Sequence, residues 1–403
     1  MAAIKRIAAD QLRVGMYVAE LNNEWIPDSN QTRYGLIKRQ AAVDQIIGLG
    51  VAHVFIDVEK GEDCADGILR EELNQPLDQA LNNIQKTADA SVSSVPLEEE
   101  LSPAKSIHGD ALNLINRVME DAKMGNAIAL QGVEDMADSI NESIRRNQNA
   151  LSCFTRFRHK DEYLMEHSFS VAVLMGVLAR SMGYHGDDLH QLVTGGLLHD
   201  VGKIQISNHI LHKPSSLEPE EWEEMKRHVQ YGEEILQQTD NMPTNILQIC
   251  AQHHERIDGR GYPRGLSGAA ITEHGKMGAV VDVYDAITAD RVYHRGMLPT
   301  QAMKKLLEWT DGHLDKDIAY QFIACMSIYP AGSLVELRGQ QLALVLEPNL
   351  RQQHQPLVKI IYDAKANTKV VPRTLNLVHC DVEQHIVRAV DPADYNLDLG
   401  QYF

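Results

Sequence analysis

The stretch LLHDVGK, residues 197–203, places a histidine and an aspartate side by side at the end of an apolar segment. Adjacent His199 and Asp200 can present an imidazole nitrogen and a carboxylate to a metal ion from a single helix end. Lys203 follows His199 by four residues, so a helix would put both on one face. Taken alone, such a pair is more often a chance dipeptide around a hydrogen-bonded core histidine. Its interpretation therefore depends on what the rest of the chain supplies.

Further histidines and aspartates occur on or at the ends of apolar helical segments on both sides of this stretch. They are His167, His228, His253, His254 and Asp282. Thirteen of the 18 histidines lie between His159 and His313. Helices that bring such groups into one bundle would bury them, and buried polar groups need partners. Imidazoles and carboxylates that project into a helical bundle are a ligand set that metal ions satisfy well.

The apolar rhythm divides the chain into four parts. Alternating residues over 1–62, among them Leu12, Met16 and Val18, predict a small β-rich domain. Residues 63–104 contain prolines and acidic stretches and predict a linker with some helix. Helical spacing dominates residues 105–330, and short alternating segments return over 331–403. We therefore expect a mainly α protein, a helical bundle between a small β-rich N-terminal domain and a short β-rich C-terminal extension.

Composition narrows the function classes. The chain has 403 residues and a formal net charge of −18, which argues against a nucleic-acid polymer as partner. The longest apolar runs fall well short of the roughly 20 residues that a membrane span needs. The N-terminus lacks the apolar core of a secretory signal. Five scattered cysteines without a CxxC pair suggest reduced thiols. We expect a cytoplasmic protein without a membrane segment.

Several of these segments match one family in order and spacing. The segments are His167-Ser168, LLHDVGK (197–203), His228, HHERIDGRGYP (253–263) and VVDVYDAITADRVY (280–293). Together they resemble the HD-GYP family over about 155–325, and the run HHE…DG.GYP is highly specific. The fold that this resemblance implies is an all-helical HD-domain bundle. Residues 4–61 also resemble the small domain of unknown function that is often found upstream of HD-GYP modules.

The resemblance implies a metal site with two divalent ions. One ion would be held by His167, His199, Asp200 and Asp282, and Asp200 would bridge to a second ion held by His228, His253 and His254. Some members add a third metal through a glutamate four residues before the first histidine. Here that position is Tyr163, and neither Glu162 nor Glu166 occupies it, so we expect a binuclear site. Iron or manganese suits these ligands, and nickel remains open.

The same resemblance assigns the supporting residues. Lys203 and Asp200 would be catalytic, with Lys203 donating to a phosphate oxygen or to the departing 3′ oxygen. Arg291 matches a phosphate-contacting arginine, and His294 stands where the family often has a basic residue. Asp285 would support a ligand rather than bind metal. The loop with Gly261, Tyr262 and Pro263 would shape the site or contact a partner such as a diguanylate cyclase domain.

The leading hypothesis is a phosphodiesterase that opens cyclic di-GMP to pGpG, with GMP left open as a further product. Two metals about 3.5–4 Å apart can lower the pKa of a bridging water toward about 7 and neutralise phosphoryl oxygens. Departures from the family at Ser207, Ser215 and His294 keep open another cyclic dinucleotide, 3′,3′-cyclic GMP-AMP. A third hypothesis is a non-catalytic adaptor that binds a nucleotide or a cyclase. The presence of all seven matched ligands favours catalysis. Apolar helical positions over 105–150 suggest a homodimer.

Overall fold

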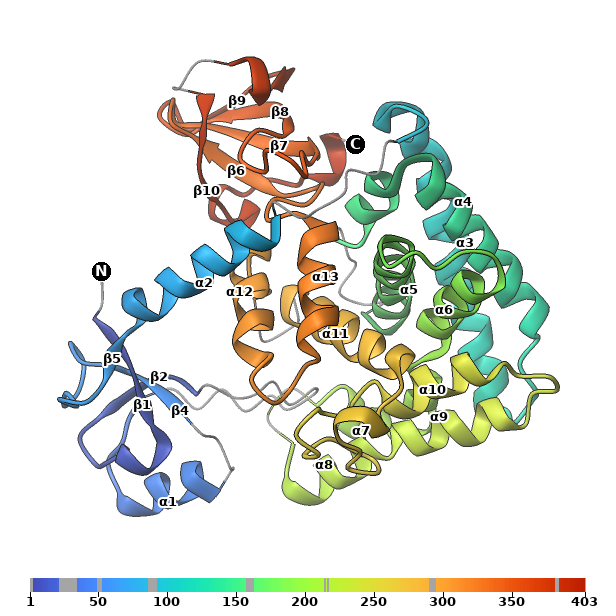
Figure 1. Cartoon of the computed structure of the whole chain (residues 1–403), viewed down its shortest axis with the longest axis horizontal. Helices are drawn as coiled ribbons and strands as arrows, with labels where there is room; N and C mark the ends of the chain where they lie inside the picture. The colour runs from blue at the N-terminus through green and yellow to red at the C-terminus, as the bar shows by residue number, and fades with distance from the viewer. Residues whose placement is uncertain are drawn as a thin grey trace. The chain divides into compact units, whose positions relative to one another are not determined.

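The computed structural model describes residues 3–21, 35–48, 53–85, 93–156, 163–213, 215, 217–289, 295–380 and 384–402 (Figure 1). The chain divides into two compact units. One unit comprises residues 1–82 with 208–225, and the other comprises residues 83–207 with 226–403. The metal-site candidates that fall within the described residues all lie in the second unit.

The first unit is built on a five-stranded antiparallel sheet with the strand order β3-β2-β4-β1-β5. Its strands are β1 (Ile4–Ala8), β2 (Tyr17–Leu21), β3 (Gly35–Leu36), β4 (His53–Asp57) and β5 (Ile68–Leu69), and α1 (Gln40–Gly48) packs with them. The unit also contains α7 (Asn208–Leu211) and most of α2 (Arg70–Gln85) and α8 (Pro219–Lys226). Val18, Val54 and Ile56 are fully buried in the core of the sheet domain.

One detail of the expected strand pattern is wrong. Leu12 and Met16 are buried, as their alternation suggested, but they lie in the connection between β1 and β2 rather than in a strand. A 3-10 turn over Ala9–Gln11 and the positive φ of +97° at Gly15 break the extended backbone there. Val14, between them in the alternating pattern, is exposed, so the alternation of apolar residues here does not mark a strand.

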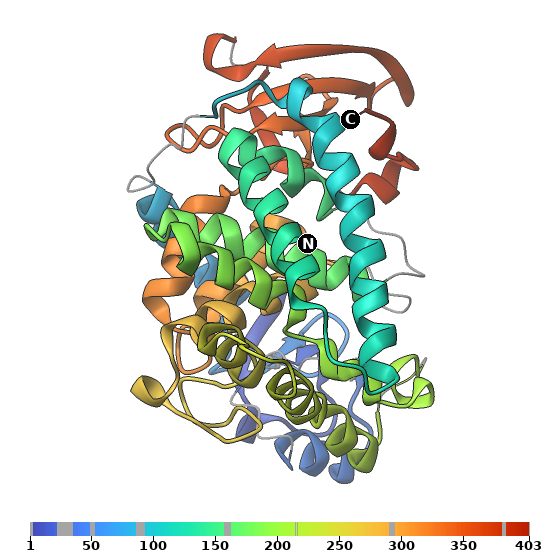
Figure 2. The same ribbon diagram turned by 90° about the vertical axis from the view of Figure 1, so that its right-hand side faces the viewer.

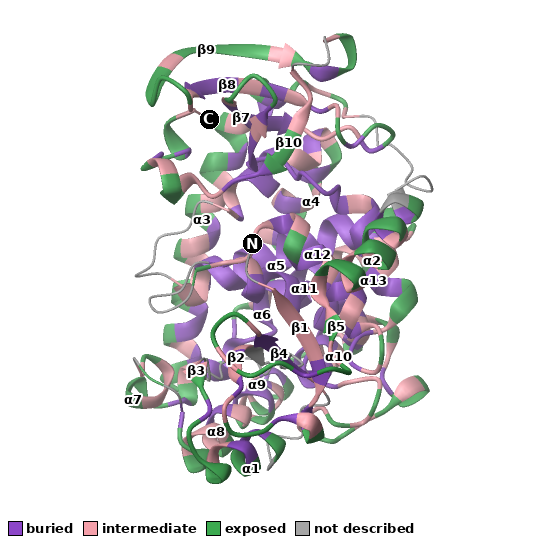
Figure 3. Cartoon of the chain, turned by 90° about the vertical axis from the view of Figure 1, so that its left-hand side faces the viewer, coloured by how far each residue is buried: buried purple, intermediate pink, exposed green. Residues whose placement is uncertain are grey.

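The second unit holds the helical bundle (Figures 1 and 2). Its helices are α3 (Leu97–Lys123), α4 (Leu130–Phe154), α5 (Tyr163–Ser181), α6 (Gly186–Leu198), α9 (His228–Gln237), α10 (Thr244–Gln252), α11 (Glu273–Thr288), α12 (Pro299–Trp309) and α13 (Lys316–Met326). Helix α5 is buried on all sides from Glu166 to Ala179, which is expected of a helix at the centre of a bundle. Figure 3 shows the same concentration of buried residues on α5 and α11.

Local signals in the sequence fix the ends of several helices. The Thr272 hydroxyl accepts a hydrogen bond from Gly275 N at the start of α11, and Asp315 accepts from Asp317 N and Ile318 N at the start of α13. Such caps satisfy backbone donors that a helix leaves free at its first turn. Pro299 stands in the first turn of α12, where its missing N–H costs nothing. The Thr272 cap therefore fixes the first turn of α11, the helix that carries Asp282.

Helices α3 and α4 lie side by side and pack against the bundle (Figure 2). Ala111, Ile115 and Val118 of α3 and Val133 and Ile140 of α4 are buried within the single chain. These are the apolar positions on which the expectation of a homodimer rested. Because the chain itself covers them, the homodimer stays a prediction without that support.

The C-terminal part of the second unit forms another five-stranded antiparallel sheet with the order β10-β6-β7-β8-β9. Its strands are β6 (Leu334–Leu337), β7 (Gln341–Glu347), β8 (Leu357–Asp363), β9 (Thr368–Asn376) and β10 (Ile386–Ala389). The expected fold class, a mainly helical protein with small β-rich parts at both ends, is confirmed. Among the residues that the structure describes, none of the helices combines the length and apolarity that crossing a membrane requires.

Candidate metal centre

Seven side chains from five helices and their ends converge in the interior of the bundle. His167 lies on α5, Asp282 on α11, and His228 begins α9. His199 and His253 cap the C-terminal ends of α6 and α10, and each is followed by a further member, Asp200 and His254. All seven are buried, none with more than 6% of its surface exposed. Helix ends carry much of the site because a residue there can turn inward without interrupting the helix.

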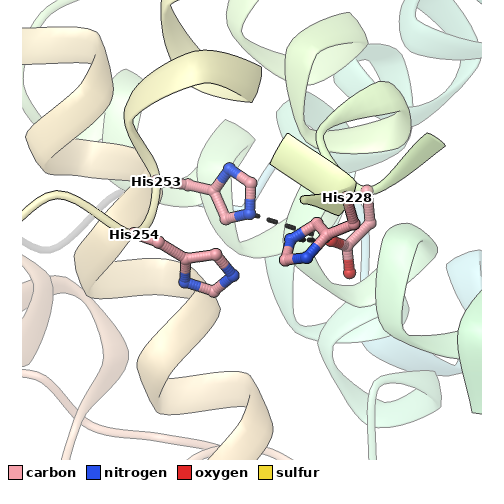
Figure 4. Close-up of side chains that lie close together, drawn as sticks. His228, His253 and His254 are labelled. Atoms are coloured by element: carbon pink, nitrogen blue, oxygen red, sulfur yellow. Dashed lines mark ion pairs between the residues drawn. The ribbon is translucent and has the colours of Figure 1, made fainter. Parts of the chain in front are cut away.

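The side chains form two groups that share one carboxylate. His167, His199 and Asp282 form the first group, and Asp200, His228, His253 and His254 form the second; within each group, one ligand atom per residue lies within 4.8 Å of the others. Figure 4 shows His228, His253 and His254 directed toward one another.

The two oxygens of Asp200 face different groups. Its Oδ1 lies 3.4 Å from His228 Nε2 and 3.7 Å from His253 Nε2, while its Oδ2 lies 3.4 Å from the Nε2 atoms of both His167 and His199. A carboxylate in this position can bridge two cations.

The outward nitrogens of three of these histidines are held by acceptors. His199 Nδ1 donates to Gly196 O at 2.8 Å, and His253 Nδ1 donates to Cys250 O at 2.8 Å. His167 Nδ1 donates to Asp285 Oδ2 at 2.6 Å. Such partners fix the ring orientation and leave Nε2 as the free ligand atom. Asp285 thus lies where a residue that supports a ligand is needed.

The nitrogen and oxygen atoms that face the centre of the site are better suited to binding a cation than to forming hydrogen bonds with one another. In the described part of the chain, His253 Nε2, His254 Nε2, Asp200 Oδ1 and Asp282 Oδ2 are buried and have no hydrogen-bond partner. Leaving several such atoms unsatisfied in a protein interior is costly. Two imidazole nitrogens facing carboxylate oxygens are a donor set for a divalent transition metal. The residues therefore fit metal ions.

The protonation states agree with this fit. Burial, followed by the nearby His199, lowers the pKa of His253 to about 3, and burial and the neighbouring imidazoles hold the pKa of His254 well below its usual value. Burial raises the pKa of Asp200, but Lys203 and His199 outweigh it and hold that pKa well below the usual range. Neutral imidazoles and an ionised carboxylate are the forms that bind metal.

Three carboxylates surround the imidazole of His167. Burial lowers the pKa of His167, but hydrogen bonds with Asp200, Asp282 and Asp285 outweigh it and raise the pKa well above the usual value. His167 Nε2 lies 3.0 Å from Asp282 Oδ1. Carboxylates crowded around one imidazole favour a positive charge at that point, which a metal ion can supply in place of a proton.

Lys203 brings an ammonium group to the edge of both groups. It lies in a short 3-10 helix over Val201–Gln205, and its Nζ lies 2.7 Å from Asp200 Oδ2. Only 5% of the residue is exposed. The sequence pattern paired Lys203 with His199 across one helical turn, whereas the structure places its ammonium against Asp200. The change of helix type after Asp200 explains the difference.

The loop after His254 packs against the second group. The ring centroid of Tyr262 lies 4.7 Å from that of His254, and Tyr262 N donates to His254 O. Buried Glu255, to which the sequence assigned no role, accepts hydrogen bonds from Arg264 N and Leu266 N and so fixes the loop. The Tyr262-Pro263 peptide bond is cis. These contacts make the loop part of the wall of the site.

The two glycines of this loop are needed for different reasons. Gly259 has φ of +78°, which favours glycine. Gly261 does not share that conformation. A Cβ atom there would lie 2.4 Å from Arg256 N and 2.5 Å from Glu255 Cα, both backbone neighbours that cannot easily move. Gly261 is therefore fixed by close backbone approach rather than by a positive φ.

Some predicted residues cannot be placed, and one contact was missed. Arg291, His294 and Glu162 lie outside the described residues. Tyr163 lies with its ring parallel to that of His167, at a centroid distance of 5.9 Å and an angle of 4°. The sequence gave no role to His108, yet its Nε2 lies 2.9 Å from Glu166 Oε2. No spacing pattern links two residues that are 58 positions apart in the chain.

Comparisons with known proteins place the chain among relatives of similar architecture. A family model described as an HD domain matches residues 134–318, and one described as a domain of unknown function, DUF3391, matches residues 4–133. Cyclic di-GMP phosphodiesterase PA4108 of Pseudomonas aeruginosa is 35% identical over 392 residues, which cover 97% of this chain and 93% of that protein.

Two further comparisons are weaker. The 3′3′-cGAMP-specific phosphodiesterase 3 of Vibrio cholerae is 37% identical over 138 residues, which cover 34% of this chain and 30% of that protein. The solved structure of Bd1817, an HDG"Y"P protein from Bdellovibrio bacteriovorus, has a TM-score of 0.46 and 19% sequence identity, and covers 79% of this chain and 98% of that chain.

Proposed function

The chain belongs to the HD-GYP family, in the branch that joins a DUF3391 domain to an HD domain, and from this membership we propose that it hydrolyses cyclic di-GMP. HD domains are metal-dependent phosphohydrolases. The observation that carries the proposal is the pair of buried side-chain groups, with one oxygen of Asp200 facing each group. PA4108 supports the choice of substrate, because it is 35% identical to this chain over 392 residues and is named a cyclic di-GMP phosphodiesterase.

We propose that the two groups hold two divalent metal ions. His167, His199, Asp282 and Asp200 Oδ2 would hold one ion, and His228, His253, His254 and Asp200 Oδ1 would hold the other. The nitrogen- and carboxylate-rich set suits iron or manganese, and it also accepts nickel. Bound there, two such ions supply Lewis acidity to a phosphodiester and a water of lowered pKa as nucleophile.

The remaining proposed roles belong to the protein's own side chains. Asp200 fixes the separation of the two groups, and Asp285 holds the ring of His167 in place. Lys203 is positioned to donate to a phosphoryl or leaving oxygen near Asp200. Arg291 and His294 would bind the second phosphate of the substrate, since a guanidinium fork matches two phosphate oxygens. Tyr262 would close the site above His254.

The product assignment and the alternative substrate are separable by experiment. We propose pGpG as the first product, with slower conversion to GMP. The cGAMP-specific relatives match only about a third of this chain, so they favour cyclic GMP-AMP less than PA4108 favours cyclic di-GMP. The test is chromatography of both cyclic dinucleotides with the metal-loaded protein, and with Asp200→Ala as control. We expect the wild type to hydrolyse cyclic di-GMP and Asp200→Ala to be inactive on it. If the metal-loaded wild type hydrolysed neither cyclic dinucleotide, the proposal would be wrong and a non-catalytic adaptor would be favoured.

Location and partners are proposals of their own. All five cysteines are free, which suits a reducing compartment, and we propose a cytoplasmic location on that ground. A diguanylate cyclase domain would contact the loop around exposed Arg260. The homodimer is tested by light scattering on the full chain, where a mass twice that of the 45.1 kDa chain is expected. A mass of one chain would contradict it.

A further inference from the structure

Helix α5 carries the ligand His167 close to its N-terminal end, where helices fray most readily. Residue His167 is the fifth of the helix, which begins at Tyr163. Within the first two turns, the side chain of His167 is tied to α11 by its hydrogen bond to Asp285. The Nε2 atom of the same ring lies 3.0 Å from Asp282 Oδ1, so both contacts direct this part of α5 toward α11. A second tie on another face would further restrict the orientation of the start of α5.

The second tie is the hydrogen bond between His108 and Glu166. His108 Nε2 on α3 donates to Glu166 Oε2 on α5 at 2.9 Å. The Glu166 side chain is 0% exposed and that of His108 is 13% exposed. Glu166 immediately precedes His167, and consecutive helical residues point about 100° apart. The two neighbours therefore hold α5 from two directions, Glu166 toward α3 and His167 toward α11.

The ring of His108 packs against two aromatic side chains rather than lying on the surface. Its centroid lies 4.8 Å from that of Phe169 on α5 and 5.5 Å from that of Phe154 at the end of α4. Phe169 is three residues after Glu166, so both lie on the face of α5 that meets α3. The aromatic rings fix the imidazole, and the imidazole in turn fixes a fully buried carboxylate. This is a junction of three helices at the start of the ligand helix.

We propose that His108 is a positioning residue for the metal ligand His167. Through Glu166 it sets the rotation of α5 and thereby the place of His167 Nε2 in the first group. Helix α3 lies within the residues that the DUF3391 model matches, so that part of the chain contributes a contact that positions a ligand in the part matched by the HD domain model. The inference rests on the proposed two-metal site and assigns it a contact that lies outside the HD match.

The test is a titration of metal-free full-length protein with Co²⁺, followed by visible absorbance. Wild type should bind two ions per chain. His108→Phe keeps an aromatic ring in the pocket but removes the donor, and should weaken one ion about 10- to 100-fold while leaving the other unchanged. His108→Gln, which retains an N–H donor, should recover most of that loss. His190→Phe is the matched control, because it breaks the exposed His190–Asp138 pair on helices other than α5.

The outcomes separate this inference from the proposed function. Two ions of wild-type affinity in His108→Phe, equal weakening of both ions, or failure of His108→Gln to rescue would each overturn the positioning role. Wild type that binds fewer than two ions would overturn the two-metal site and the inference together. If His108→Phe does not fold, Glu166→Leu removes the same bond from its other side and replaces a buried carboxylate with an apolar group. Selective loss of one ion is expected there too, and unchanged binding would overturn the role.

Discussion

Asp200 is the residue on which both histidine groups depend, because each of its oxygens faces a different group. Its position follows from the end of α6, where the backbone passes from α-helix to 3-10 helix between Leu198 and Val201. That turn also brings Lys203 Nζ to within 2.7 Å of Asp200 Oδ2. A carboxylate, an ammonium group and several imidazoles are thereby held within one buried volume.

The first prediction concerns Lys203. Lys203→Ala should lower kcat for cyclic di-GMP about 100- to 1,000-fold, as expected when a fixed donor to a developing charge is removed. The metal content should stay at two ions per chain, because Lys203 is not a ligand. Steady-state kinetics on metal-replete protein, with Lys105→Ala on the exposed surface of α3 as control, measures the effect. Normal turnover by Lys203→Ala would show that its ammonium serves only to balance the charge of Asp200.

A second residue-scale prediction concerns acid stability. Burial, followed by Arg256, lowers the pKa of His313 to about 3. An unfolded histidine has a pKa of about 6.5, so below that pH the unfolded chain binds a proton that the folded chain does not. Folding stability is therefore lost as the pH falls from about 6.5 toward about 3, by about 2 kcal/mol at pH 5.

Urea unfolding of wild type and His313→Phe at pH 7.5 and pH 5.0 tests this linkage. The variant should lose about 2 kcal/mol less stability between the two pH values than wild type. The same substitution at His209, whose side chain is 83% exposed, should leave the pH dependence of unfolding as in wild type. An identical pH dependence in His313→Phe and wild type would refute the assignment.

Much of the residue chemistry could be predicted from the sequence. The seven metal-group residues sit in short motifs, so their types and order carried the inference, and the structure brings those side chains together. Contacts between distant positions could not be predicted in this way. The His108–Glu166 pair depends on how α3 crosses α5, and nothing in the local sequence of either helix encodes that crossing. The role of Glu255 depends on a loop conformation that only the folded chain defines.

At the scale of elements, the loop over residues 255–266 determines the shape of one side of the site. The Glu255 side chain accepts hydrogen bonds from Arg264 N and Leu266 N at the end of the loop. The ring of Tyr262 packs on His254, which immediately precedes the loop. The sequence predicted a loop here from its glycines and proline. Gly259 has a positive φ, whereas Gly261 is explained by the backbone atoms that pass beside it. A glycine motif shows that space or freedom is needed but does not say which.

Gly261→Ala should therefore disturb the loop as a whole. The new Cβ would meet backbone atoms of Arg256 and Glu255 at 2.4 and 2.5 Å, so the loop must shift and Tyr262 must leave His254. We expect a loss of about 1–3 kcal/mol in unfolding free energy and a lower kcat/KM. Gly109→Ala is the control, because nothing lies within 4 Å of its Cβ and alanine favours a helix. Equal stability of the two variants would contradict the close approach at Gly261.

At the scale of the whole molecule, the chain forms two units that do not follow its order. Residues 208–225 belong with residues 1–82, although they come between helices of the bundle. The sequence predicted a mainly helical middle between two β-rich ends, and that fold class is confirmed. It could not predict the grouping of 208–225, since the local sequence of a short helix does not say which unit the helix joins.

Metal removal should affect the stability of the whole second unit. Its centre contains buried imidazole and carboxylate atoms without hydrogen-bond partners in the described residues, so the folded form gains from cations that the unfolded chain binds less well. Ligand at 100 times its Kd contributes about 2.7 kcal/mol per site. A chelator should therefore lower the Tm by several degrees, and added Mn²⁺ should restore it. The Tm of Asp200→Ala should change little when the chelator is added. A wild-type Tm that does not change with the chelator would contradict a stabilising role for bound metal.

The most direct measurement of the central claim is anomalous X-ray diffraction from crystals of the metal-loaded protein. We expect two anomalous peaks about 3.5–4 Å apart. One should lie among His167, His199 and Asp282, the other among His228, His253 and His254, with Asp200 between them. A single peak, or two peaks outside these groups, would contradict the claim that Asp200 joins two metal ions in one phosphodiesterase site.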